Sequence, residues 1–399
     1  MLDYILYILF FTFIIILIIY VYIKFKFGFW TYLPVFHTYN IKYKFFPIGI
    51  INHNLPIKNK YTNFKNIETI VYSELSELKI NKFTNFVKKK YMQNGYSQFL
   101  PNMQNITTYF NCHNGKSFIS FFNEDILLAD LKKGKNVTDS RIVGIITTRP
   151  IRIFINNQDK DAVFNAYYID YFCLETKTEK NEIFPQLIQT HYYNQCHITS
   201  KINPCFFKSD NVELGIVPLC KYSVYEFTVT KWSKPDDFSP HFKLIEINPQ
   251  NFYLLFDFIK NISHKFDIIM YADCSNIVEL IKTKNIFIYA IVFQEEIKCA
   301  YFFRKTCIFI EKSLEIVSCF ASINNCEKDI FIQGFKISFW KIITENNFGH
   351  ASVENISDNN IIIDNLCMKT NPVSIKMSAY YFYNFAYHTF LSAKTFILI

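Results

Sequence analysis

The sequence predicts a mixed α/β (α+β) body of two lobes that follows an N-terminal transmembrane helix. The chain has 399 residues, half of them hydrophobic, which is enough for two domains that each bury a core. Strand-like apolar runs and helical segments alternate in both halves. We therefore divide the chain into an anchor over residues 1–24, an N-terminal lobe over 25–240 and a C-terminal lobe over 241–399.

The anchor is the strongest single signal. Tyr4–Ile23 is an uninterrupted run of apolar, aromatic and threonine residues, which matches the roughly 20 residues that a helix needs to cross a bilayer. A cleaved signal peptide is the alternative, but the run lacks a basic segment before it and an Ala-x-Ala-like site after it. Asp3 precedes the run, and Lys24 and Lys26 follow it. The positive-inside rule then predicts a single-pass membrane protein with its body in the cytosol.

Composition excludes several classes of function. The nine glycines form neither a dinucleotide fingerprint nor a Walker loop. The net charge of +8 is spread along the chain, and its densest cluster, Lys88–Lys90, is short. We therefore expect a solvated helix face there and no nucleic-acid partner. The abundance of isoleucine, lysine, asparagine, phenylalanine and tyrosine is typical of an AT-rich genome, such as that of a parasite or a large DNA virus.

Cysteine and histidine do not form a metal-binding pattern. The 11 cysteines include no Cys-x-x-Cys pair, and the 9 histidines have no ligand spacing. The neighbours Cys112 and His113 cannot hold a metal alone. We expect no metal and predict buried free thiols in a reducing compartment.

Periodicity and turn residues locate the main elements of the first lobe. A strand, a polar loop and a helix in this order place a helix N-terminus where it can face a diphosphate. The predicted elements are a helix over Asn63–Tyr91, a strand over Arg141–Thr148 that ends before Pro150, a strand over Tyr167–Leu174, and a helix over Ile183–Gln195 with Pro185 in its first turn.

The second lobe repeats this order after a polar, proline-containing linker. The sequence shows no residue-level internal repeat. The predicted elements are the linker Trp232–Pro240, a helix over Gln250–Ile262, strands over Ile286–Phe293, Lys298–Phe303 and Leu314–Phe320, and a helix over Cys326–Asn346.

Six segments, in the same order along the chain, resemble the glycylpeptide N-myristoyltransferase family. The family's Phe-Trp-x-x-Gln-Pro-Val resembles Phe-Trp-Thr-Tyr-Leu-Pro-Val at residues 29–35, and its Glu-Ile-Asn-Phe-Leu-Cys-Val-His-Lys falls without gaps on Tyr-Ile-Asp-Tyr-Phe-Cys-Leu-Glu-Thr at 168–176. The other resembling segments are Ile142–Thr147, Phe184–Ile188, Val217–Tyr222 and Tyr380–Phe385.

This resemblance implies two fused acetyltransferase-like lobes and a transfer reaction. The donor would be acyl-CoA, in the family myristoyl-CoA, and the acceptor would be the amine of a protein's N-terminal glycine. Family members bind the thioester oxygen with two consecutive backbone amides, which match those of Tyr171 and Phe172. Packing within a buried strand is the structural alternative for these two residues.

The resemblance also implies that the terminal carboxylate of Ile399 is the base. The last residues, Ile397–Ile399, are apolar, which favours burial of the chain end. Burial would raise the pKa of that carboxylate, and a neighbouring cation would lower it. A terminus that is simply packed in the core is the alternative.

Residues that resemble the family's coenzyme-binding positions are Phe29, Trp30, Lys180, Asn181, Ile183 and Phe184. The loop that contains two of them departs from the family. A basic Arg-Ser-Lys-Arg segment is replaced by Glu-Lys-Asn-Glu at 179–182. A carboxylate about 5 Å from a phosphate would cost about 3 kcal/mol before screening. This loop disfavours coenzyme A, although amides at the helix start remain as anion donors.

A second departure leaves the function open. The family's glycine-rich Lys-Phe-Gly-x-Gly-Asp-Gly signature would fall near Cys367–Val373, which has no glycine. Three hypotheses remain: an N-myristoyltransferase-like enzyme, an inactive relative that binds lipid or protein as a structural membrane component, and a transferase that acts on another amine. The acidic loop favours the second, and the apolar C-terminus favours the first.

Overall fold

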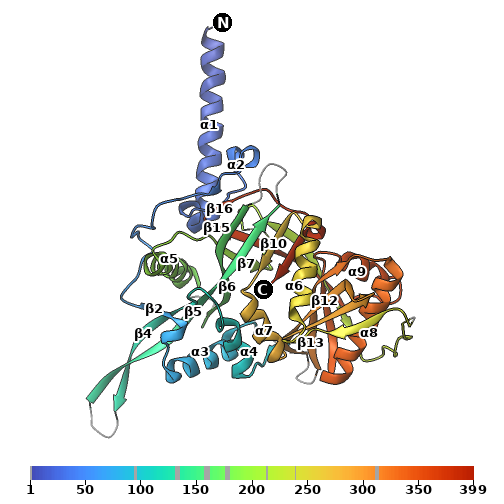
Figure 1. Cartoon of the computed structure of the whole chain (residues 1–399). Coiled ribbons are helices and arrows are strands. Elements are labelled where there is room, and N and C mark those ends of the chain that lie inside the picture. Colours follow the sequence, from blue (N-terminus) through green and yellow to red (C-terminus); the bar gives the residue numbers. More distant parts are fainter. Residues whose placement is uncertain are drawn as a thin grey trace.

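One large mixed sheet runs through the whole body (Figure 1). The computed structural model describes residues 2–93, 97–130, 135–156, 162–175, 180–212, 214–238, 240–310 and 314–399, apart from the side chains of 2, 3, 27, 32, 126–130, 135–139 and 180–182. Within these ranges the sheet has 15 strands, in the main order β17-β10-β5-β6-β7-β15-β8-β14-β13-β12-β11-β9. β2 and β4 extend it beside β5, and β3 pairs with β12.

The strands are β1 (Gly49–Ile50), β2 (Ile67–Val71), β3 (Ser97–Phe99), β4 (Phe118–Asp130), β5 (Lys135–Ile155), β6 (Ala162–Leu174), β7 (Cys205–Ser209), β8 (Cys220–Thr228), β9 (Lys243–Glu246), β10 (Ile268–Tyr271), β11 (Ile286–Phe293), β12 (Glu296–Ile310), β13 (Leu314–Asn324), β14 (Phe348–Glu354), β15 (Ser374–Tyr383), β16 (Phe385–Ala386) and β17 (Thr395–Leu398).

The α-helices are α1 (Leu2–Phe27), α2 (Ile41–Phe45), α3 (Glu77–Lys90), α4 (Met103–Thr107), α5 (Lys180–Thr199), α6 (Phe252–Asn261), α7 (Cys274–Lys282), α8 (Lys328–Asn346) and α9 (Asn359–Cys367), and the 3₁₀ turns are η1 (Gly28–Tyr32), η2 (Tyr72–Glu74), η3 (Thr108–Phe110), η4 (Ser263–Lys265) and η5 (Ser392–Lys394).

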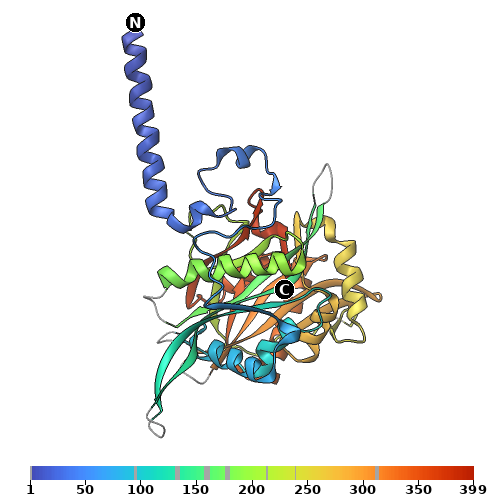
Figure 2. The ribbon, with the colours of Figure 1, turned by 90° about the vertical axis from the view of Figure 1, so that its left-hand side faces the viewer.

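Helices cover both faces of the sheet. Next to β5 and β6, α5 lies on one face, as Figure 2 shows, and α3 and α4 lie on the other. Next to β11–β13, α8 and α9 cover one face, and α6 packs on the other together with α7. The α3 and α6 sides share one hydrophobic cluster, so the core is continuous from one half of the body to the other.

The chain end holds the two halves together. β17 runs parallel to β10, and β10 pairs antiparallel with β5 of the first half. β15, also from the last part of the chain, lies between β7 and β8. The sheet therefore passes across residue 240 without interruption, and the division of the body at that residue stays a prediction.

α1 stands away from the body (Figure 1). Its segment Tyr4–Lys26 has a mean hydropathy of 2.8, and no part of that window is buried. By length and composition, this helix could cross a membrane.

Most of the predicted elements are confirmed. β5 and β6 contain the two strands expected in the first half. α5 contains its helix. In the second half, β11, β12, β13, α6 and α8 match the expected segments to within a few residues or extend them.

Three local predictions were wrong. The helix expected over Asn63–Tyr91 begins only at Glu77, because Ile67–Val71 pairs with β4 as strand β2. Pro185 is not in the first turn of its helix, because α5 already begins at Lys180.

Pro150 does not end its strand either. β5 pairs with β4 as far as Thr148 and with β10 from Arg152, so Pro150 lies where that side of the strand changes its partner. Proline has no amide hydrogen to donate, and at this position no strand on that side pairs with β5.

Candidate functional site

A β-bulge interrupts the pairing of β5 with β6. Ile146 is opposite Phe172, but the next pair is Thr148 with Ile169, so two residues of β6 lie opposite the single Thr147. The extra residue turns backbone groups out of the regular ladder. The bulge coincides with the segment in which the resemblance places backbone donors for a thioester oxygen.

Of the two predicted donor residues, Tyr171 lies in this bulge and Phe172 directly follows it, with their side chains on opposite faces of the sheet. The ring of Phe172 packs edge-on against Phe184 of α5, with 5.0 Å between centroids. The ring of Tyr171 belongs to the cluster that α3 covers, at 5.1 Å from Tyr91. These contacts fix the backbone of the bulge from both sides.

The amide of Tyr171 already has an acceptor. It donates to Oγ1 of Thr147 at 3.0 Å, and both groups are buried. A thioester oxygen would have to share this donor or replace the threonine hydroxyl. The bulge therefore provides an amide that donates to a side chain of β5 and not to a backbone carbonyl of that strand.

A buried ion pair adjoins the bulge. Nε of Arg149 lies 2.5 Å from Oδ2 of Asp170, and Arg149 is 1% exposed. The guanidinium also lies over the rings of Tyr109 and Tyr168, at 5.2 and 5.3 Å. Its Nη1 has no hydrogen-bond partner in the part of the chain that the structure describes. Neither residue of this pair is marked by a motif or a spacing in the sequence.

The predicted coenzyme-binding aromatics come together beside α5. The ring of Trp30 is nearly parallel to that of Phe207, at 6.2 Å and 8°, and meets Phe184 edge-on at 5.9 Å. Phe29 contacts Phe184 at 5.7 Å. Ile183 is buried in the same cluster. The structure thus joins the segment after α1 to the first half of α5.

The acidic loop falls outside what the structure describes. Residues 176–179 lie between the described ranges, and the side chains of 180–182 are not described. Lys180 and Asn181 form the described start of α5. The effect of Glu179 and Glu182 on a phosphate stays a prediction.

The C-terminus is buried, as the apolar tail predicts. Ile399 is 1% exposed and packs in one cluster with Ile268, Met270 and Ile397. Figure 1 shows the C-terminus in the middle of the body. Ile399 is not among the described residues that line the cavity next to the bulge. Its role as a base stays a prediction.

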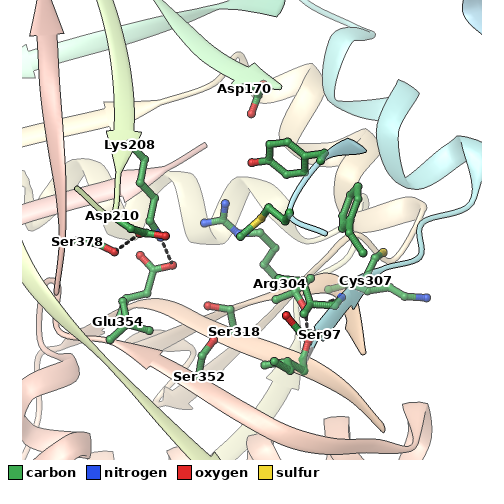
Figure 3. A pocket seen from close by; sticks show the side chains of 18 of the residues that line it. Ser97, Asp170, Lys208, Asp210, Arg304, Cys307, Ser318, Ser352, Glu354 and Ser378 are labelled. Atoms are coloured by element: carbon green, nitrogen blue, oxygen red, sulfur yellow. Dashed lines mark hydrogen bonds and ion pairs between the residues drawn. The ribbon is translucent and has the colours of Figure 1, made fainter. Parts of the chain in front are cut away.

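A cavity of about 730 Å³ opens beside the bulge, between strands of both halves (Figure 3). Its wall includes the bulge itself together with charged groups from five other strands, β7, β8, β12, β14 and β15. The lining residues that matter here are Tyr168, Asp170 and Tyr171 of β6, Lys208 of β7, Arg304 of β12 and Glu354 of β14.

Arg304 is the distinctive cation of this cavity. Its guanidinium lies 4.5 Å from the ring centroid of Phe320, and its Nε is buried without a hydrogen-bond partner. No carboxylate lies within ion-pair distance of it among the residues that the structure describes. Burial opposes its charge, but nearby acidic groups, Glu354 foremost, outweigh this effect and raise the pKa of the guanidinium. Arg304 is therefore charged and open to an anionic ligand.

Glu354 supplies the opposite charge. It is 5% exposed, and its Oε1 accepts from Nζ of Lys208 at 3.4 Å. Its Oε2 is buried and has no hydrogen-bond partner within the described ranges. Figure 3 shows Lys208 and Glu354 on one side of the cavity, with Arg304 across from them. The cavity can therefore bind a ligand that offers an acceptor group to Arg304 and a donor group to Glu354.

A polar network connects α5 with β4 and β5. His191 is fully buried between the hydroxyl of Ser120, 2.7 Å from Nδ1, and that of Thr148, 2.9 Å from Nε2. Thr148 donates its own proton to Gln195, so Nε2 of His191 donates to Thr148 and Nδ1 accepts from Ser120. Burial lowers the pKa of His191 from 6.5 to about 3.

This histidine should make the fold sensitive to acid. Between pH 6.5 and 3, the unfolded chain binds a proton that folded His191 does not, so the free energy of unfolding falls as pH falls. The loss is at most about 1.4 kcal/mol per pH unit, or about 2 kcal/mol at pH 5. Denaturant unfolding of the full chain in detergent should show this slope.

The variant H191Q is the control, because glutamine can make both hydrogen bonds and does not titrate. His37 and His113 also have lowered pKa values and remain in both proteins. The dependence on pH should be weaker in H191Q by the stated amount. An equal dependence of the unfolding free energy on pH in both proteins would contradict the lowered pKa of His191.

Comparison with known proteins identifies the fold. No protein-family model matches the sequence, and no curated protein matches it. The structure superposes on Saccharomyces cerevisiae N-myristoyltransferase with bound myristoyl-CoA at a TM-score of 0.68 and 11% identity, over 92% of this chain and 94% of that chain. The body has the N-myristoyltransferase fold.

A structure of the same yeast protein with bound myristoyl-CoA and inhibitors gives a TM-score of 0.64 and 13% identity, with 92% of each chain covered. The predicted fold class, in which two acetyltransferase-like lobes are fused, is thereby confirmed.

Proposed function

We propose that this chain is a membrane-anchored acyltransferase that moves a fatty acyl group, myristoyl in the first instance, from acyl-CoA to the N-terminal glycine amine of a protein. One observation carries the proposal. In a body with the N-myristoyltransferase fold, a β-bulge with an out-of-ladder amide forms part of the wall of a large cavity with charged residues.

The reaction makes an amide bond at the bulge. The amine nitrogen attacks the thioester carbon, the carbon–sulfur bond breaks, and the coenzyme leaves as a thiol that receives the proton lost by the amine. The amides of Tyr171 and Phe172 would hold the developing negative charge on the thioester oxygen. The terminal carboxylate of Ile399 would accept the amine proton before it passes to sulfur.

The cavity would receive the acceptor chain. Arg304 has no carboxylate partner among the described residues, and Glu354 has an unpaired oxygen. An acceptor with an acidic side chain near its N-terminus would pair with Arg304, and its backbone amides could donate to Glu354. We therefore expect the cavity to prefer acidic acceptors to basic ones.

The aromatic cluster at α5 would bind the donor. Phe29, Trp30 and Phe184 form an apolar surface that directly follows the anchor helix and reaches the bulge through Phe172. A fatty acyl chain fits this surface by burial of apolar area. The amides at the start of α5 would face the phosphates.

α1 would anchor the protein as a single-pass membrane protein with the body in the cytosol, because Lys24 and Lys26 follow the apolar run. Protease added to the cytosolic side of sealed vesicles should digest the body. Asn105 and Asn136 each begin an Asn-x-Thr glycosylation sequon, so a glycan on either of them would show the opposite orientation.

Donor binding gives the first test. Calorimetry of the full chain in nanodiscs should show one site for myristoyl-CoA that binds myristate and free coenzyme A more weakly. W30F should weaken binding about 2- to 10-fold, because it removes ring contacts worth about 0.5–1.5 kcal/mol. W340F, which changes a tryptophan of α8 in another cluster, is the control and should bind normally.

Equal binding of myristate and myristoyl-CoA would contradict the donor assignment, because the coenzyme would then make no contribution. That result would instead indicate a protein that only binds lipid.

A further inference from the structure

The segment between the anchor and the body has an unusual composition. No aspartate or glutamate occurs between Asp3 and Glu68. The lysines in this stretch are Lys24, Lys26, Lys42, Lys44, Lys58, Lys60 and Lys65. A stretch with basic residues only, directly after an apolar helix, matches the requirements of an anionic membrane surface.

Part of this segment exposes large apolar side chains to solvent. In and after α2, Phe45 and Phe46 are 73% and 70% exposed, and Ile41 is 65% exposed. Ile57 is 81% exposed. A soluble surface rarely leaves so many neighbouring apolar groups uncovered. We call residues 39–58 the juxtamembrane platform.

The platform lies beside the last turns of α1. Figures 1 and 2 both show α2 raised from the sheet on the side of the body from which α1 leaves. Burial raises the pKa of Tyr39, and Tyr20 of α1 adds to this effect. Burial lowers the pKa of His37, and the charge of Lys24 contributes to that shift. Residues 37 and 39 therefore lie near the C-terminal turns of the predicted span.

The body holds the platform on both sides. Before it, His37 forms a β-bridge with Ile216. Within it, Gly49–Ile50 pairs with β16, and the amide of Asn52 donates to Oδ1 of Asn384 at 2.8 Å. These attachments hold the exposed residues Phe45 and Phe46 in a defined position relative to the body.

We propose that the juxtamembrane platform docks on the bilayer that α1 enters, with Phe45 and Phe46 in the headgroup region and its lysines on anionic lipids. Aromatic rings next to lysines have the composition of interfacial segments. If α1 spans up to Ile23, a segment beside Tyr20 and Lys24 lies at the depth of the membrane surface. This inference concerns the membrane and does not depend on the acyl-transfer reaction.

Brominated-lipid quenching of an introduced tryptophan tests the docking. The full-length F46W variant is placed in nanodiscs, one copy per disc, with lipids brominated near the top of the acyl chain. The wild-type signal of Trp30, Trp232 and Trp340 is subtracted. L78W is the matched control, because Leu78 is 66% exposed but lies on α3, far from α1 in Figure 1.

We expect F46W to be quenched at least twofold more than L78W, and more strongly in discs with one quarter phosphatidylserine than in phosphatidylcholine alone. K42E with K44E should remove that dependence on the anionic lipid. Equal quenching of F46W and L78W in both lipids would overturn the proposal. A chain that fails to stay in the discs would overturn it too. Quenching of F46W that is absent with one copy per disc and appears only with two copies would also overturn it, because the residue would then contact a second chain and not lipid.

Discussion

A short extension after Ile399 is expected to lower acyl transfer by at least 100-fold and to leave donor binding unchanged. The terminal carboxylate is proposed as the base, and a base must lie within hydrogen-bond distance of the amine that it deprotonates. Ile399 is buried at the end of β17, which pairs with β10. An added residue would move the charge away without changing the bulge at Tyr171.

Deletion of Leu398 and Ile399 should have the same effect on transfer, and I399V should have little, because it keeps the position of the carboxylate. An equal extension before Met1 controls for the added residues. The rate of labelled acyl transfer to a peptide with an N-terminal glycine is the measurement. Normal turnover by the C-terminally extended chain would exclude the terminal carboxylate as the base.

Replacement of Arg304 by glutamine is expected to raise KM for an acidic acceptor peptide by about 10- to 100-fold, with a smaller effect on kcat. A hydrogen bond to a charged group contributes about 1.5–3 kcal/mol, which corresponds to that range. Arg304 lines the cavity and has no carboxylate partner among the described residues, so its loss removes an interaction that is available to the ligand.

A peptide series with aspartate, alanine or lysine near the N-terminal glycine gives the decisive comparison. The wild type should prefer aspartate, and R304Q should lose that preference. R141Q controls for the loss of a positive charge, because Arg141 is 48% exposed and lies outside the lining of the cavity. Thermal unfolding reports whether R304Q stays folded. A wild type that binds the lysine peptide as well as the aspartate peptide would contradict the role of Arg304.

Local signals in the sequence were sufficient for the main elements. The uncharged run at Tyr4–Ile23, the apolar strand Tyr167–Leu174 and the helix that became α8 all have a pattern that extends over a whole element. Residues 67–71 were misread because their partner is β4, and a pairing across that distance has no local signature. The prediction that the strand ends before Pro150 was wrong for a similar reason, because only the folded sheet shows where β5 changes its partner.

The candidate site divides in the same way. The resemblance predicts Tyr171 and Phe172 as donor residues, and the structure places Tyr171 in a bulge and Phe172 next to it. Arg304 and Glu354 lie on β12 and β14, and only the folded sheet brings them to one cavity. Nothing in a single sequence marks either of them, because each stands within an ordinary strand. The pair of Arg149 with Asp170 was missed for the same reason.

Mass spectrometry of an acceptor peptide tests the central claim most directly. The untagged full chain in nanodiscs is mixed with myristoyl-CoA and a peptide with an N-terminal glycine and a nearby aspartate. We predict a peptide product with the myristoyl group on its terminal amine, formed in step with release of free coenzyme A. Tight binding of myristoyl-CoA without any such product, for peptides and acyl chains of several kinds, would contradict the account.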